Sequence, residues 1–147
     1  MRTTDFSAAP PAGQATAMFV GATRYAGLTS IVRLTGRWLR MVRQMKRMTG
    51  YRWHTVYYRF PFTLGTIAFF SDRDALLKFA RSRHHRDLMC WVTDGTRNAT
   101  AGFIRLYDAA PHGYSNGVWR AEGDGMAHVP TFTALSTEVD GPPVHRP

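Results

Sequence analysis

The chain has 147 residues, a formal net charge of +9 at pH 7 and 44% hydrophobic residues. A chain of this size buries roughly two thirds of its unfolded surface, which excludes a disordered tail protein. The single cysteine, Cys90, excludes a disulfide framework and a multi-cysteine zinc site. No apolar run is long enough to span a membrane and no signal peptide is recognisable, so we expect a soluble, cytoplasmic protein.

The positive charge is concentrated in one part of the chain. The interval between Asp5 and Asp72 contains no acidic residue. It contains nine basic residues, the first of which is Arg24 and the last Arg59. From residue 72 onward, the basic and acidic residues balance. A local excess of this kind is compatible with binding to nucleic acid, anionic lipid or an acidic small molecule.

The first third of the chain predicts a leader, a strand and a long helix. Residues 1–15 are small, polar and proline-rich, and residues 16–25 are rich in strand formers. We expect Thr29 or Ser30 to cap the helix and Gly50 to end it. Its apolar stripe, spaced by three and four residues, is Ile31, Leu34, Trp38, Met41, Met45 and Met48. The polar residues Arg33, Arg37, Arg40, Gln44 and Arg47 fall on the opposite side.

Two strands and a second helical region follow. Residues 51–59 and 62–70 are aromatic and β-branched, which predicts two antiparallel strands. Ser71 and Asp74 form a capping box of the S-x-x-D type that predicts the start of a helix. The helical pattern resumes at residues 88–91.

The last third predicts one clear strand at residues 102–107 and two shorter strands near 118–121 and 129–135. We therefore expect a flexible leader at 1–15, one domain at 16–137 and a flexible tail at 138–147. The sequence assigns no role to the extension that starts at residue 109.

The order strand, helix, strand, strand, helix, strand predicts an α+β fold of the ferredoxin-like βαββαβ type. Its antiparallel sheet carries both helices on one face. The predicted strands carry large apolar side chains on both sides, so the other face must also be covered. A homodimer formed sheet to sheet, a dimeric α/β barrel, is the simplest cover.

The histidines are the best candidates for chemistry, since no Walker A, G-x-G-x-x-G, H-E-x-x-H or G-x-S-x-G motif is present. His84 and His85 are adjacent in the second helical region. Neighbouring residues of a helix point about 100° apart, which disfavours one shared metal ion. His54 lies in a strand among aromatic residues, and Cys90 is expected to be a buried apolar residue.

The run FTLGTIAFFSDRDALLKFARSRHHRDLMCWV resembles the strand, cap and second helix of dimeric α/β-barrel proteins, which include spheroidene monooxygenase and small bacterial monooxygenase-like families. The segment FVGATRY, followed by Trp38, Arg43, Met45 and Met48, is similar to their first strand and helix. The resemblance covers residues 18–108. The positions that match in the first run are Phe70, Ser71, Asp72, Leu77, Phe79, Ala80 and His85.

This resemblance implies a pocket between the sheet and the helices of each monomer. Some members of the superfamily bind haem there, and others act on electron-rich aromatic substrates without a cofactor. If haem binds, His85 resembles the axial ligand of the iron, and Arg24, Arg59 or Arg105 would pair with the propionates. Without a cofactor, His85 or His54 would act as a base on a phenolic substrate, and an arginine would stabilise the oxyanion.

Three functions remain open at this point. The first is a monooxygenase-type oxidoreductase that acts on a small apolar or aromatic molecule, with or without haem. The second is a domain that binds a small ligand without catalysis. The third and least favoured is a nucleic-acid-binding protein that uses the arginine-rich helix together with nearby aromatic residues at 51–58.

Overall fold

The computed structural model describes residues 2–115. The chain divides into two units, one formed by residues 15–109 and the other by residues 1–14 together with 110–147. In the described part of the second unit, β1 (Arg2–Thr3) pairs antiparallel with β6 (Gly113–Tyr114). All of the site described below belongs to the unit of residues 15–109.

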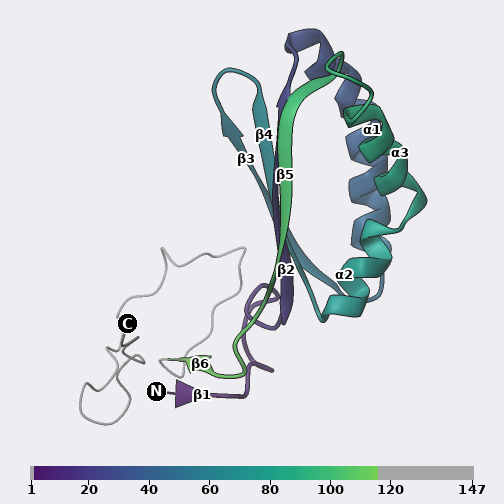
Figure 1. Cartoon of the computed structure of the whole chain (residues 1–147). Coiled ribbons are helices and arrows are strands. Elements are labelled where there is room, and N and C mark those ends of the chain that lie inside the picture. Colours follow the sequence, from purple (N-terminus) through teal and green to yellow (C-terminus); the bar gives the residue numbers. More distant parts are fainter. Residues whose placement is uncertain (1, 116–147) are drawn as a thin grey trace. The chain divides into compact units, whose positions relative to one another are not determined.

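That unit is built on an antiparallel sheet of four strands in the order β3-β4-β2-β5 (Figure 1). The strands are β2 (Ala17–Tyr25), β3 (Tyr51–Arg59), β4 (Thr63–Phe70) and β5 (Ala99–Asp108). The first and third strands of the predicted βαββαβ order, β2 and β4, lie side by side in the centre of the sheet. The predicted strand bounds therefore agree with the structure to within three residues.

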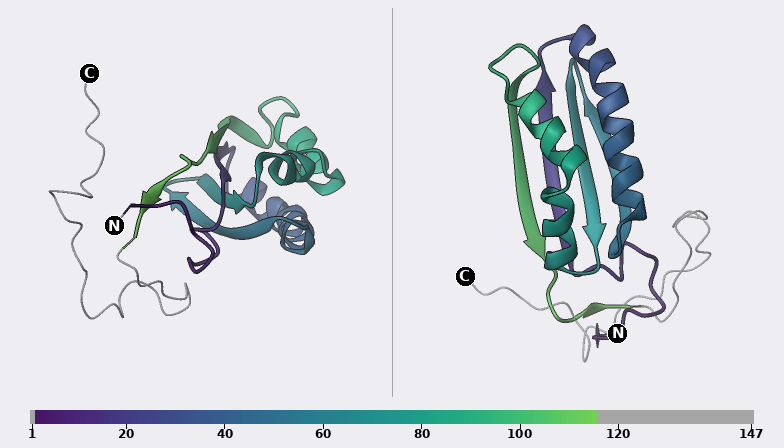
Figure 2. Two further views of the ribbon diagram at one scale, coloured as in Figure 1. Left: turned by 90° about the horizontal axis from the view of Figure 1, so that it is seen from below. Right: turned by 90° about the vertical axis from the view of Figure 1, so that its right-hand side faces the viewer.

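Three helices lie on one face of this sheet: α1 (Leu28–Arg47), α2 (Arg73–Ala80) and α3 (Arg83–Val92) (Figures 1 and 2). The predicted α+β ferredoxin-like architecture is thus confirmed. The second helical region is split because the chain turns at Arg81 and Ser82. There the backbone N–H of Ser82 donates to the carbonyl oxygen of Phe79 over 2.9 Å, and Ser82 itself has an extended conformation.

The predicted helix boundaries need three corrections. α1 ends at Arg47 with Met48 as its C-cap, so Gly50 lies beyond the helix and does not end it. The residue before α1 is Gly27, so Thr29 and Ser30 lie inside the helix and do not cap it. At α2, Asp72 is the cap, because its Oδ1 accepts the N–H of Ala75 over 2.7 Å. Ser71 does not cap α2, since its Oγ donates to Asp72 Oδ2 and its N–H donates to the carbonyl oxygen of Gly50.

The core lies between the helices and the sheet. The predicted stripe of α1 faces it, and Leu34, Met41 and Met45 are buried. Three phenylalanines join α2 to the central strands, with ring centroids 5.6 Å apart for Phe70 and Phe79 and 6.0 Å apart for Phe19 and Phe79. Because such rings bury large apolar areas, this cluster fixes α2 over β2 and β4.

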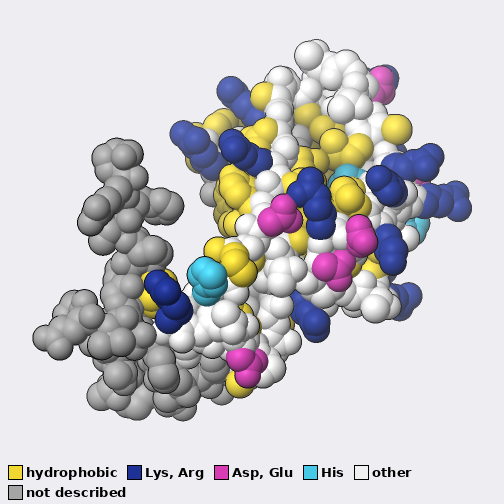
Figure 3. Space-filling view, turned by 60° about the horizontal axis from the view of Figure 1, so that its bottom comes forward, with side chains coloured by type: hydrophobic (Ala, Val, Ile, Leu, Met, Phe, Trp, Pro, Cys, Tyr) yellow, Lys and Arg dark blue, Asp and Glu magenta, His cyan; other side chains and the backbone are white. Residues whose placement is uncertain are grey.

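The opposite face of the sheet carries apolar side chains that no helix of this unit covers. On this face the ring of Trp53 lies 5.7 Å from that of Phe69, and the ring of Tyr57 fills the space above Gly65. The edge strand β5 is exposed from Thr100 to Asp108 and lies beyond α2 and α3 in the right view of Figure 2. Figure 3 shows hydrophobic and basic side chains together on the side away from the helices.

Several expectations fall on residues outside the described range. They are the short strands near 118–121 and 129–135 and the tail at 138–147, so the division of the chain at 15 and 137 stays a prediction. Among residues 2–115, no helix is both long and apolar enough to cross a membrane.

Candidate functional site

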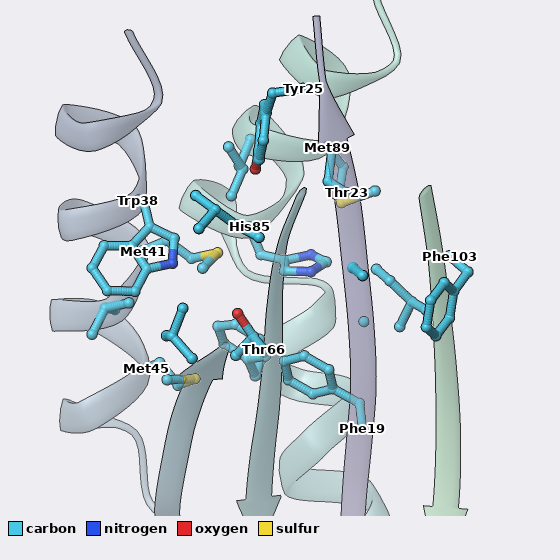
Figure 4. Close-up of a pocket in the computed structure, with 18 residues that line it drawn as sticks. Phe19, Thr23, Tyr25, Trp38, Met41, Met45, Thr66, His85, Met89 and Phe103 are labelled. Atoms are coloured by element: carbon cyan, nitrogen blue, oxygen red, sulfur yellow. The ribbon is translucent and has the colours of Figure 1, made fainter. Parts of the chain in front are cut away.

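A cavity of about 290 Å³ lies between the sheet and the helices. Residues from the four strands β2 to β5 and from α1, α2 and α3 line it, and most of them are apolar (Figure 4). Methionine side chains are flexible and polarisable, so the three in this wall can adapt to an aromatic ligand. The apolar lining includes Phe19, Trp38, Met41, Met45, Phe79, Leu88, Met89 and Ile104.

His85 extends from the first turn of α3 into this cavity (Figure 4). Its Nδ1 lies 2.8 Å from the backbone carbonyl oxygen of Ala80. A carbonyl oxygen can only accept, so Nδ1 carries the proton and Nε2 keeps a free lone pair. The ring also stands edge-on to Phe79, with centroids 5.0 Å apart, which fixes its orientation.

The surroundings of His85 favour its neutral form. Burial lowers the pKa of His85 below its usual value of 6.5, and the hydrogen bond with Ala80 opposes this effect more weakly. The imidazole is therefore neutral at pH 7. Nε2 can accept a proton from a ligand in the cavity.

Three residues with hydroxyl groups line the same cavity: Thr23, Tyr25 and Thr66. Tyr25 is only 7% exposed, and burial raises its pKa to about 12, so its hydroxyl stays protonated and can donate. Thr23, two residues earlier on β2, hydrogen-bonds to Tyr25. In the view of Figure 4, the hydroxyl of Tyr25 and the side chain of Thr66 enter the cavity from opposite ends, with His85 between them.

The structure places Arg24, Arg59 and Arg105 away from the cavity, since none of the three contributes to its lining. Arg24 is exposed and lies between Thr23 and Tyr25 on β2. Alternate residues of a strand point to opposite faces, so Arg24 points away from the cavity that its two neighbours line. The guanidinium of Arg105 lies over the ring of Tyr107, 5.7 Å from its centroid.

The remaining candidates also lie elsewhere. His54 on β3 is not part of the cavity lining, and its Nδ1 lies 2.7 Å from the hydroxyl oxygen of Tyr51. Burial and the charge of Lys46 lower the pKa of His54. His84 faces the outer side of α3, so the two adjacent histidines point apart as expected. The expected burial of Cys90 is wrong, because this residue is exposed on α3.

The residues at the cavity do not fit haem. Its propionates need cationic partners, yet the lining contains no lysine or arginine. The cavity volume also lies at the lower end of the range for small-molecule sites, roughly 300–1,000 Å³. Among residues 2–115, no group of three or more His, Cys, Asp or Glu side chains is arranged to hold a metal ion.

Tyr25 and Thr66 are the site residues that sequence reasoning missed. The strand alternation carried a signal for Tyr25, because Phe19, Thr23 and Tyr25 are separated by even numbers of residues on one predicted strand. Once Phe19 is assigned to the core, the hydroxyl groups of Thr23 and Tyr25 belong to the same face.

The sequence matches no protein-family model and no curated protein. Solved structures do share the fold. SnoaB, a cofactor-independent oxygenase from Streptomyces nogalater, is 16% identical with a TM-score of 0.53 over 65% of this chain and 94% of that chain. An antibiotic biosynthesis monooxygenase is 15% identical with a TM-score of 0.54 over 65% and 99%. A conserved protein from Methanosarcina mazei Go1 is 15% identical with a TM-score of 0.55 over 66% and 96%.

Identities this low establish the fold alone. They confirm the predicted α+β ferredoxin-like fold. The particular likeness to spheroidene monooxygenase stays a prediction.

The lowered pKa of His85 makes stability depend on pH. In the unfolded chain the imidazole of His85 takes up a proton near pH 6.5, and in the folded chain it does so only at lower pH. The contribution of neutral His85 to the stability of the folded state is therefore complete above pH 6.5. It is lost as the pH falls through the folded-state pKa. We expect the free energy of unfolding, measured with urea, to fall between pH 7 and pH 5. The fall should be smaller in His85→Gln, where His54 is the one remaining histidine among residues 2–115 with a lowered pKa. Equal slopes for both proteins would contradict this.

Proposed function

We propose that the protein is an oxidoreductase of monooxygenase type that oxidises a small aromatic molecule in the cavity without a bound cofactor. One observation carries the proposal: the neutral imidazole of His85, with Nδ1 held by Ala80, presents a free Nε2 lone pair to an apolar space. The fold shared with SnoaB, which is described as a cofactor-independent oxygenase, adds support.

The chemistry starts with the removal of a proton. Nε2 of His85 accepts the proton of a phenolic hydroxyl group and produces an electron-rich phenolate. Such an anion can transfer electrons to molecular oxygen. Oxidation of a phenol to its para-quinone balances without another reductant. One oxygen atom enters the ring at the para carbon. The hydroxyl hydrogen and the para hydrogen leave with the other oxygen atom as water, and the substrate supplies all four electrons.

Tyr25 takes the role for which the sequence suggested an arginine. Its hydroxyl remains protonated because its pKa is about 12, so it can donate a hydrogen bond to the developing phenolate oxygen. The bond strengthens as negative charge forms, because a donor in an apolar cavity stabilises an anion more than a neutral group.

The test of the base is the pair His85→Gln and His84→Gln, with 1-naphthol as the substrate. Loss of a general base typically lowers the rate by about 10²- to 10⁴-fold, so kcat should fall by this factor in His85→Gln only. Oxygen uptake and the formation of 1,4-naphthoquinone are measured together and should be equimolar. Turnover that survives in His85→Gln would exclude the mechanism. Binding of 1-naphthol without oxygen uptake by the unmodified protein would favour a non-catalytic ligand-binding domain.

The role of Tyr25 is tested by two ligands that differ by one hydroxyl group. Removing a hydrogen bond weakens binding by about 2- to 10-fold, so Tyr25→Phe should lose this much affinity for 1-naphthol. Its affinity for naphthalene should not change, because naphthalene offers no oxygen to the donor. Dissociation constants from tryptophan fluorescence provide the measurement. A similar loss for both ligands would assign Tyr25 to packing alone.

We further propose that the chain forms a homodimer through the uncovered face of the sheet. The rings of Trp53, Phe69 and Tyr107 lie on this face by strand alternation. Phe103 belongs to the same face by alternation and is 56% exposed, although it also borders the cavity. Apolar surface of this kind is stabilised by burial against a second copy, and a symmetric pair of sheets covers both faces at once.

The dimer is tested by placing a charge on each side of the molecule. Phe103→Glu should shift the mass measured by sedimentation equilibrium from two chains to one, because a buried unpaired carboxylate opposes association. Val32→Glu is the matched control, since Val32 is 66% exposed on α1. A mass of one chain for the unmodified protein, or two chains for Phe103→Glu, would contradict the proposal.

A further inference from the structure

A second hollow, separate from the cavity of His85, lies on the outer side of the helix layer between α1 and α3. Its volume is about 460 Å³. Arg37 and Arg40 contribute from α1, and Arg83 and His84 contribute from the first turn of α3. Figure 3 shows basic side chains, with a histidine among them, gathered on the side of the molecule that carries the helices.

The positive charge at this hollow is largely uncompensated. Within residues 2–115, neither Arg37 nor Arg40 forms an ion pair, and the Nε of Arg83 lies 3.9 Å from Asp87 with both side chains exposed. Arg43 and Arg47 continue the series along α1 and line an adjoining hollow that shares Arg40 and His84. Like charges three or four residues apart destabilise a helix, and a bound anion relieves this repulsion.

Part of the hollow is already held in place. The guanidinium of Arg37 lies 5.1 Å from the ring centroid of Trp91, so packing between α1 and α3 restricts its position. The start of α3 adds a second attraction for anions. Its cap residue, Ser82, makes no capping hydrogen bond, and the Oγ of Ser82 is buried without a partner. The first N–H groups of α3 therefore lack a side-chain acceptor.

We propose that this hollow binds a small molecule that carries a phosphate or diphosphate group. Facing arginines from two helices match several oxygens of such a group, because each guanidinium donates two parallel hydrogen bonds. Leu88 and Trp91 supply apolar contacts for the rest of the molecule. A hollow with cations from two helices suits one compact phosphate group better than an extended nucleic-acid strand, which needs cations spread along its backbone. This site is independent of the function proposed for the central cavity.

The test titrates the full chain with pyrophosphate and follows binding by calorimetry. The double variant Arg40→Gln with Arg83→Gln removes two cations of the hollow. The control double variant, Arg33→Gln with Arg52→Gln, removes two exposed cations outside it and changes the net charge equally. Loss of charge-assisted hydrogen bonds should weaken binding at least about tenfold in the first variant only.

Cys90 gives a second measurement, because it is exposed, lines the hollow and is the only cysteine of the chain. Pyrophosphate should slow its alkylation by iodoacetamide in the unmodified protein and in the control variant. It should not slow alkylation in Arg40→Gln with Arg83→Gln. Equal weakening of pyrophosphate binding in both double variants, or no saturable binding, would overturn the proposal. So would tighter binding of a single-stranded oligonucleotide that both variants weaken equally.

Discussion

The geometry of the site depends on the hydrogen bond between His85 Nδ1 and the carbonyl oxygen of Ala80, and this bond exists because α2 ends there. The last carbonyl groups of a helix have no partner within the helix. The turn at Arg81 and Ser82 brings His85 back over the end of α2, where its N–H meets the carbonyl of Ala80. One uninterrupted helix would use that carbonyl for its own backbone. The break between α2 and α3 thus fixes which nitrogen of His85 faces the cavity.

Much of the fold could be predicted because its signals are local. The three- and four-residue spacing of Leu34, Met41 and Met45 marks the buried side of α1, and the aromatic strands are separated by clear breaks. The capping of α2 could not be predicted in the same way. Ser71 has the right spacing for a cap, but its N–H and Oγ have partners elsewhere, one of them Gly50 from a distant turn. A competition of this kind becomes visible only when distant segments are placed together.

The site was predictable in part for a related reason. His85 could be selected because the resemblance to dimeric α/β-barrel proteins places a histidine a few residues after Phe79 and Ala80. The position of the arginines could not be settled, because the strands carry apolar residues on both sides and alternation alone does not say which side is the cavity. The exposure of Cys90 could not be predicted either. Leu88 is the one buried residue of α3, and the spacing of apolar residues in the sequence does not show how little of this helix is buried. In the folded chain, the ring of Trp91 contacts the guanidinium of Arg37 at the outer hollow and lies 6.4 Å from the ring of Tyr25, which lines the cavity.

The position of β5 at the edge of the sheet has a consequence for the behaviour of the chain in solution. Within the described residues, its outer side pairs with no strand. The backbone N–H and C=O groups of every second residue of this ten-residue strand are therefore available to another chain. Long apolar edges of this kind promote uncontrolled strand addition and aggregation. A charged side chain in the middle of such a strand opposes it, and Arg105 occupies this position between Ile104 and Leu106. We therefore expect Arg105 to oppose fibrous association through this edge, a role that involves no ligand.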